Sequence, residues 1–130
     1  MMKDALRVVL VVEDDLSVRR PLVKFLELNG FAVVAAETGD EGVEISRKQR
    51  LDAAVIDLRL RQGSGREVVA AIPAGIPVII FSGLPSESGE LERSRPHTRL
   101  IEKPYSLVAL IATLEEMIAA AAADSKNLHS

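Results

Sequence analysis

The run LDAAVID at residues 51–57 decides the fold of this chain. Its aliphatic residues are typical of a buried strand in a parallel sheet, which has a short and nearly continuous apolar pattern. The run ends in an acid, Asp57. Open α/β sheets bind their ligands at the carboxyl ends of their strands, so an acid in this position indicates a functional site.

Two further apolar runs and one extended segment end in polar residues in the same way. These runs and the polar residues at their ends are RVVLVV (7–12) with Glu13 and Asp14, IPVIIF (76–81) with Ser82, and TRLIE (98–102) with Lys103. Because parallel strands end at one edge of a sheet, we expect three carboxylates, a hydroxyl and an ammonium group to meet there.

Helical patterns separate the strands. The expected helices are residues 16–29, a helix that Thr38 or Asp40 caps and that ends near residue 50, and residues 66–72 and 105–123. FAVVAA (31–36) is a further strand, and residues 84–96 form a short mobile helix or an irregular loop. Pro21 falls inside the first helix, so either Ser17 caps that helix or the helix is kinked. This alternation predicts an α/β fold, a doubly wound five-stranded parallel sheet with helices on both faces.

The composition limits the class of protein. With 130 residues, of which 48% are hydrophobic and 3% aromatic, the chain holds one domain with an aliphatic core. We expect this domain at residues 1–123 and a flexible tail at 124–130. The net charge of −3 without a basic cluster argues against direct binding of nucleic acid. The N-terminal apolar run is too short for a signal peptide or a membrane span, so we expect a cytoplasmic protein without membrane attachment.

The expected cluster of Glu13, Asp14 and Asp57 has the chemistry of a cation site. Neighbouring carboxylates repel one another unless a cation lies between them, and an all-oxygen set suits Mg²⁺. With Lys103 beside it, Asp57 is placed to attack phosphorus, and the same cations stabilise the aspartyl phosphate that results. Ser82 can donate a hydrogen bond to that phosphoryl group.

The order and spacing of these residues resemble the receiver domain of bacterial two-component response regulators over nearly the whole chain. The matching pieces are VVEDD (11–15), VID (55–57), Gly65, IPVIIFSG (76–83) and EKPY (102–105). The resemblance implies the flavodoxin-like strand order 2-1-3-4-5.

The resemblance also implies a role for each residue and a set of partners. The roles are Asp57 as phosphoacceptor, Asp14 as a direct Mg²⁺ ligand, Glu13 as a ligand through water, the Arg59 backbone carbonyl as a further ligand, Ser82 as switch hydroxyl and Lys103 as phosphate-binding lysine. The bond between Lys103 and Pro104 is expected to be cis. The donor is then a histidine kinase or a histidine phosphotransfer protein, and the target is a downstream protein. We expect a regulator rather than an enzyme, as a monomer or a weak homodimer.

Two departures from the family pattern leave alternatives open. Many receivers have Tyr or Phe where this chain has Leu100, and their loop after the phosphoacceptor usually has Pro and Asp-Gly in place of Arg61 and Ser64-Gly65. One alternative is therefore an unphosphorylated receiver-like docking module. A second is a Mg²⁺-dependent aspartyl-phosphate phosphatase, but enzymes of the haloacid-dehalogenase type need an acid at the position of Arg59. A flavin or nucleotide binder would need a glycine-rich phosphate loop after the first strand, and the chain has acids there.

Overall fold

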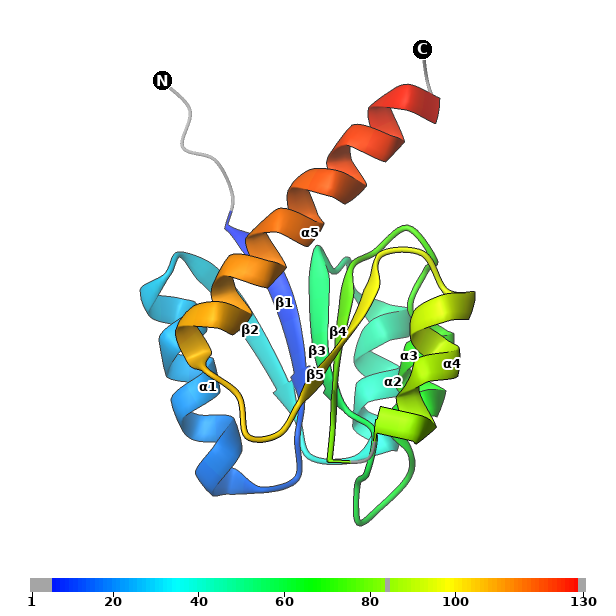
Figure 1. Cartoon of the computed structure of the whole chain (residues 1–130). Coiled ribbons are helices and arrows are strands. Elements are labelled where there is room, and N and C mark those ends of the chain that lie inside the picture. The colour runs from blue at the N-terminus through cyan, green and yellow to red at the C-terminus, as the bar shows by residue number, and fades with distance from the viewer. Residues whose placement is uncertain (1–5, 84, 129–130) are drawn as a thin grey trace.

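Five parallel strands form the centre of the molecule in the computed structural model, which describes residues 6–83 and 85–128 (Figure 1). The strands are β1 (Arg7–Val12), β2 (Phe31–Ala36), β3 (Ala53–Asp57), β4 (Val78–Ser82) and β5 (Thr98–Glu102). Their order in the sheet is β2-β1-β3-β4-β5. The fold class and the strand order expected from the sequence are confirmed.

Helices cover both faces of the sheet (Figure 1). One face carries α1 (Leu16–Leu28) and α5 (Leu107–Leu128), and the other carries α2 (Gly39–Lys48), α3 (Gly65–Ala71) and α4 (Pro85–Ser94). Within residues 6–83 and 85–128, no helix is both long and apolar enough to cross a membrane.

Alternate residues of the central strands point to the two faces. Val9 and Val11 of β1 belong to the apolar cluster under α1 and α5, whereas Leu10 and Val12 belong to the cluster under α2 and α3. All four side chains are fully buried. Because a slip of one residue would exchange the two sets, burial on both faces fixes the register of the sheet. That register determines which polar residues meet at its carboxyl edge.

Asp15 caps helix α1, so the alternative in which Ser17 is the cap is wrong. Oδ1 of Asp15 accepts hydrogen bonds from the amide of Ser17 at 2.9 Å and from its hydroxyl at 2.7 Å. A carboxylate in this position satisfies amides that have no partner inside the helix. The helix runs without interruption through Pro21 to Leu28.

The last two helices differ in extent from the sequence prediction. Residues 85–94 form helix α4, where the sequence left a helix or a loop open. Helix α5 continues to Leu128 beyond the predicted end at Ala123, because its alanine-rich end favours a helix and Asp124 pairs with His97 at 2.8 Å. The division of the chain into a domain and a tail at residue 123 stays a prediction.

Candidate functional site

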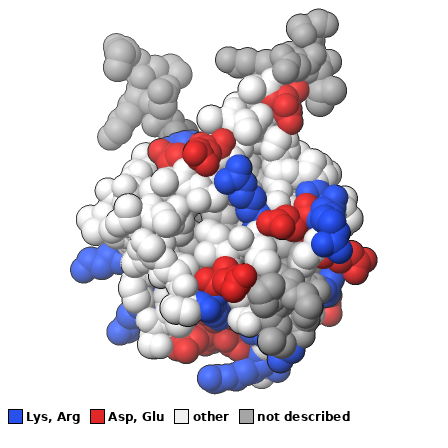
Figure 2. Space-filling model, viewed as in Figure 1, with Lys and Arg blue, Asp and Glu red and all other residues white. Residues whose placement is uncertain are grey.

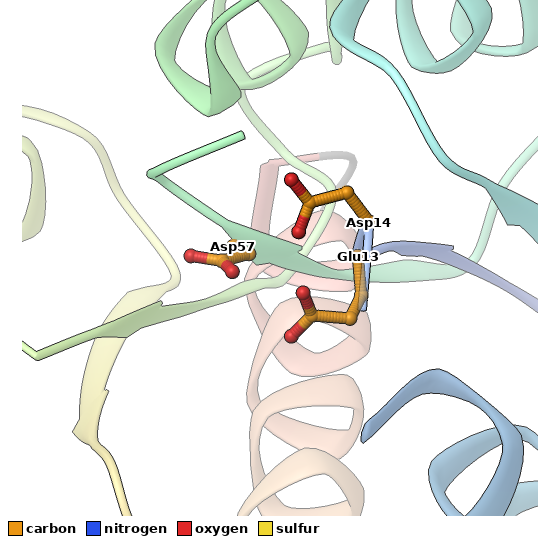
Figure 3. A group of neighbouring side chains, drawn as sticks. All are labelled: Glu13, Asp14 and Asp57. Carbon is orange, nitrogen blue, oxygen red and sulfur yellow. The ribbon is translucent and has the colours of Figure 1, made fainter. Parts of the chain in front are cut away.

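Three carboxylates meet at the carboxyl edge of the sheet (Figure 3). Glu13 and Asp14 follow β1, and Asp57 ends the neighbouring strand β3. Val12 is paired with Ile56, so the residues that follow each of them lie side by side. One oxygen of each carboxylate lies within 4.8 Å of an oxygen of both others. The cluster expected from the sequence is therefore formed, and its hard oxygen atoms suit a divalent cation.

The ammonium group of Lys103 lies against this cluster. Its Nζ donates hydrogen bonds to Oδ2 of Asp57 at 2.9 Å and to Oε1 of Glu13 at 3.4 Å. The backbone amide of Lys103 donates to the carbonyl of Ser82 at 3.2 Å, which holds the lysine at the end of β4. The bond from Lys103 to Pro104 is cis, as the resemblance implied. A cation is thus in direct contact with the acid that ends β3.

Burial sets the protonation behaviour of this edge. The side chain of Glu13 is only 1% exposed, and its burial raises its pKa to about 7; the amide of Asp15 opposes this shift, and the charge of Asp57 adds to it. Burial lowers the pKa of Lys103, but its hydrogen bond to Asp57 and the charges of Asp57 and Glu13 outweigh that effect and raise it. Lys103 is therefore a cation at neutral pH, whereas Glu13 titrates there.

The loop between β3 and α3 covers the cluster with backbone amides. The amide of Arg59 donates to Oδ1 of Asp57 at 3.0 Å, and the amide of Arg61 donates to Oδ2 of Asp14 at 2.7 Å. Gly65 begins α3 so close to β3 that a Cβ there would overlap the carbonyl oxygen of Asp57. Only glycine permits this approach. Sequence reasoning missed both amide contacts, since no local pattern encodes the contact between Arg61 and Asp14.

The other residues expected near the site lie on its border. Ser82 ends β4 and is buried, one residue beyond Phe81, which is paired with Asp57 in the sheet. Asp15 serves as the cap of helix α1. The roles of Ser82 as switch hydroxyl and of the Arg59 carbonyl as ligand stay predictions.

An apolar groove adjoins the charged cluster at Lys103. Its lining residues are Val18, Pro21, Lys103, Pro104, Tyr105 and Leu107. Figure 2 shows that the face over the first turns of α5 and the adjoining part of α1 carries few charged side chains. The ring of Tyr105, one of the lining residues, stacks on the fully buried ring of Phe81 with centroids 4.3 Å apart. The sequence does not predict this stack, because each aromatic residue taken alone has the pattern of an ordinary core residue.

The chain is similar to known regulators. The family model of the response regulator receiver domain matches residues 9–115. Regulatory protein VirG of Agrobacterium fabrum is 27% identical over 115 residues, which are 85% of this chain and 46% of VirG. Acid tolerance regulatory protein ActR of Rhizobium meliloti is 44% identical over 63 residues, which are 48% of this chain and 32% of ActR. The chain thus spans less than half the length of these relatives.

Solved structures share the fold. A response regulator receiver protein from Sinorhizobium medicae matches with a TM-score of 0.82 at 22% identity, over 89% of this chain and 97% of that one. The receiver domain of a sensor histidine kinase from Pseudomonas aeruginosa matches with a TM-score of 0.77 at 24% identity, over 88% of this chain and 99% of that one. That structure has a magnesium ion coordinated in its active site cleft.

Proposed function

Because the chain belongs to the family of response regulator receiver domains, we propose that it accepts a phosphoryl group on Asp57 from a histidine kinase or a phosphotransfer protein. Receiver domains are regulators, so phosphorylation changes the surface of the domain, and a downstream protein recognises the changed surface. The observation that carries the proposal is the contact of Lys103 Nζ with Asp57 Oδ2 at 2.9 Å, beside the carboxylates of Glu13 and Asp14. A charged lysine on a carboxylate at a cation site is an arrangement that stabilises the charge of a transferred phosphoryl group.

Mg²⁺ is the proposed cofactor. Asp14 and Asp57 would hold it directly, Glu13 through water, and the backbone carbonyl of Arg59 as a further ligand. The donor set supports this choice, since its atoms are all hard oxygens and Mg²⁺ keeps several waters when carboxylates bind it. The closeness of the three carboxylates supports it as well, because carboxylates held within 4.8 Å of one another favour a cation between them. When bound, the ion neutralises the carboxylates and the oxygens of the incoming phosphoryl group.

The residues of the chain supply the rest of the chemistry. With acetyl phosphate as donor, a carboxylate oxygen of Asp57 forms a bond to phosphorus while the bond from phosphorus to the acetyl oxygen breaks. The electron pair leaves with acetate, and no proton has to move because one carboxylate attacks and another departs. Lys103 stabilises the charge on the transferred group, and Ser82 donates a hydrogen bond to it.

The partner that carries a phosphohistidine is proposed to dock on the apolar groove beside Lys103. A donor has to bring phosphorus within bonding reach of Asp57, so its surface has to cover the rim of the site. The groove offers apolar surface at that rim, between Pro21 of α1 and Tyr105. Apolar surface bordered by polar groups is typical of protein interaction sites.

Phosphorylation of the whole chain by acetyl phosphate tests the proposal. We expect one added phosphate by mass spectrometry in Mg²⁺, none in EDTA, and none on Asp57→Asn. Asp52→Asn is the matched control, since Asp52 directly precedes the other end of the same strand and accepts a hydrogen bond from the amide of Val8. This control is expected to be phosphorylated like the wild type. Wild-type labelling of Asp57→Asn overturns the assignment.

A further inference from the structure

The ring of Tyr105 stacks on the ring of Phe81, with centroids 4.3 Å apart and an angle of 10° between the planes. Phe81 is fully buried in β4 and directly precedes Ser82. Tyr105 comes two residues after Lys103, beyond the cis bond to Pro104. One pair of rings therefore joins the two segments that carry the proposed phosphoryl-binding hydroxyl and ammonium groups.

Backbone hydrogen bonds connect the same segments to the strand of the phosphoacceptor. The amide of Lys103 donates to the carbonyl of Ser82 at 3.2 Å. The amide of Leu58, which follows Asp57, donates to the carbonyl of Phe81 at 3.2 Å. A shift of the end of β4 toward a phosphoryl group on Asp57 thus moves the main chain that bears the Phe81 ring.

Tyr105 also belongs to the surface of the molecule. Its half-buried side chain lines the apolar groove together with Val18 of α1 and Leu107 of α5. The same residue is therefore in contact with the buried end of β4 and with the surface between two helices. Stacked aromatic pairs contribute free energy beyond the area that they bury, so the stack resists a change on either side.

We infer that Tyr105 is a positioning residue, whose stack on Phe81 holds Ser82 and Lys103 in the arrangement that binds a phosphoryl group and passes the phosphorylation of Asp57 on to the groove. This inference rests on the proposed function. Coupling between two sites is reciprocal, so a residue that stabilises the phosphoryl-binding arrangement is itself affected when the phosphoryl group is bound.

The intrinsic fluorescence of the chain reports on Tyr105 alone, because the chain has one tyrosine and no tryptophan. The intrinsic fluorescence of the wild-type chain is titrated with beryllofluoride in Mg²⁺, while ¹⁹F NMR measures how much of this phosphoryl mimic is bound. We expect the tyrosine intensity to change and to saturate together with the ¹⁹F signal. An unchanged intensity at full occupancy overturns the inference and leaves the proposed function standing. Failure of beryllofluoride to bind overturns the proposed function itself.

Two variants test the positioning role separately. Tyr105→Phe keeps the ring, and we expect the wild-type rate of phosphorylation by acetyl phosphate. Tyr105→Leu lacks the ring, and we expect a rate about two- to tenfold lower, the loss that corresponds to one aromatic pair. Phe25→Leu is the matched control, because it removes a ring from the same apolar cluster at a distance from the site, and it should keep the wild-type rate.

The outcomes separate positioning from general stability. Melting curves establish a temperature at which every variant is folded, and the rates are compared there. A wild-type rate in Tyr105→Leu, or an equal loss in Tyr105→Phe or Phe25→Leu, overturns the positioning role. If Tyr105→Leu does not fold, the fluorescence titration of the wild type decides.

Discussion

Arg61 covers Asp14 from the loop that follows β3: its backbone amide donates to Oδ2 of Asp14 at 2.7 Å, and its Nε lies 3.9 Å from the same oxygen. The side chain of Arg61 is 83% exposed, whereas that of Asp14 is 16% exposed. The backbone contact persists when the side chain is replaced by another that keeps the amide. The guanidinium, however, adds positive charge next to the proposed metal site, and this charge opposes the approach of a divalent cation.

Replacing this arginine should therefore tighten metal binding. Arg61→Met is expected to lower the dissociation constant for Mg²⁺ about two- to threefold, a modest gain because solvent screens the exposed guanidinium. Isothermal titration calorimetry measures the dissociation constant of each variant. Arg50→Met removes the same charge from an 89% exposed side chain at the other end of the sheet and should leave the constant unchanged. Weaker binding by Arg61→Met would show that the guanidinium supports the site.

Removal of one carboxylate should lower the affinity for Mg²⁺. Asp14→Asn is expected to weaken Mg²⁺ binding at least about tenfold, since a charged ligand is lost. In metal-free solution the same variant should melt at a higher temperature, because the crowding of Glu13, Asp14 and Asp57 is relieved. Calorimetric titration and thermal melting in EDTA measure the two effects, with Asp52→Asn as control. Unchanged metal affinity would contradict the ligand role of Asp14.

The candidate site was largely predictable because its groups follow local patterns. Asp57 ends an apolar run, and the parallel topology brings the ends of neighbouring strands together whatever their distance along the chain. The contact of Lys103 with Asp57 follows from that topology and from side-chain length. The contact of Arg61 with Asp14 does not, because it depends on how an irregular loop folds back over residues 47 positions away.

The errors of prediction also have physical causes. The carboxylate of Asp52, which is 25% exposed, accepts a hydrogen bond from the amide of Val8 at 2.8 Å, a contact that the sequence did not predict. The start of β1 lacks a partner for that amide, and the sequence does not show which side chain supplies one. Helix α5 passes its expected end because residues 119–128 contain no glycine or proline that would stop it.

The stability of the metal-free chain should depend on pH through Glu13. Its folded-state pKa of about 7 lies above the ordinary value of 4.5, so between these values the folded chain holds a proton that the unfolded chain has released. The free energy of unfolding should therefore fall as the pH rises through this window. Urea unfolding in EDTA at several pH values between about 5 and about 8 measures the slope.

Two changes should flatten that slope. Glu13→Gln removes the titrating group, and saturating Mg²⁺ replaces the proton by a cation. Glu44→Gln is the control, because the pKa of Glu44 is lowered by its hydrogen bond to Lys48 and lies outside the window. A slope that persists in Glu13→Gln would mean that another group titrates between the folded and unfolded states.

The first residue of α3, Gly65, should tolerate no side chain. A Cβ there would lie 2.7 Å from Cα of Leu58 and would overlap the carbonyl oxygen of Asp57, both of which are backbone atoms that cannot move without displacing β3. Gly65→Ala is therefore expected to lower the free energy of unfolding by about 1–3 kcal/mol. Gly75→Ala is the matched control, because its Cβ would meet nothing within 4 Å, and a change within about 1 kcal/mol of the wild type is expected.

The same displacement should reach the chemistry, since the backbone that Gly65 approaches carries the phosphoacceptor. Gly65→Ala should be phosphorylated by acetyl phosphate more slowly than the wild type under conditions in which both are folded, because the attacking carboxylate is moved relative to Lys103. Gly75→Ala should react at the wild-type rate. Urea unfolding curves and the rate of phosphate incorporation are measured on all three proteins. If Gly65→Ala is destabilised and yet reacts at the wild-type rate, Gly65 contributes to packing but not to the position of Asp57. If Gly65→Ala is as stable as Gly75→Ala, α3 lies less tightly against Asp57 than the geometry indicates.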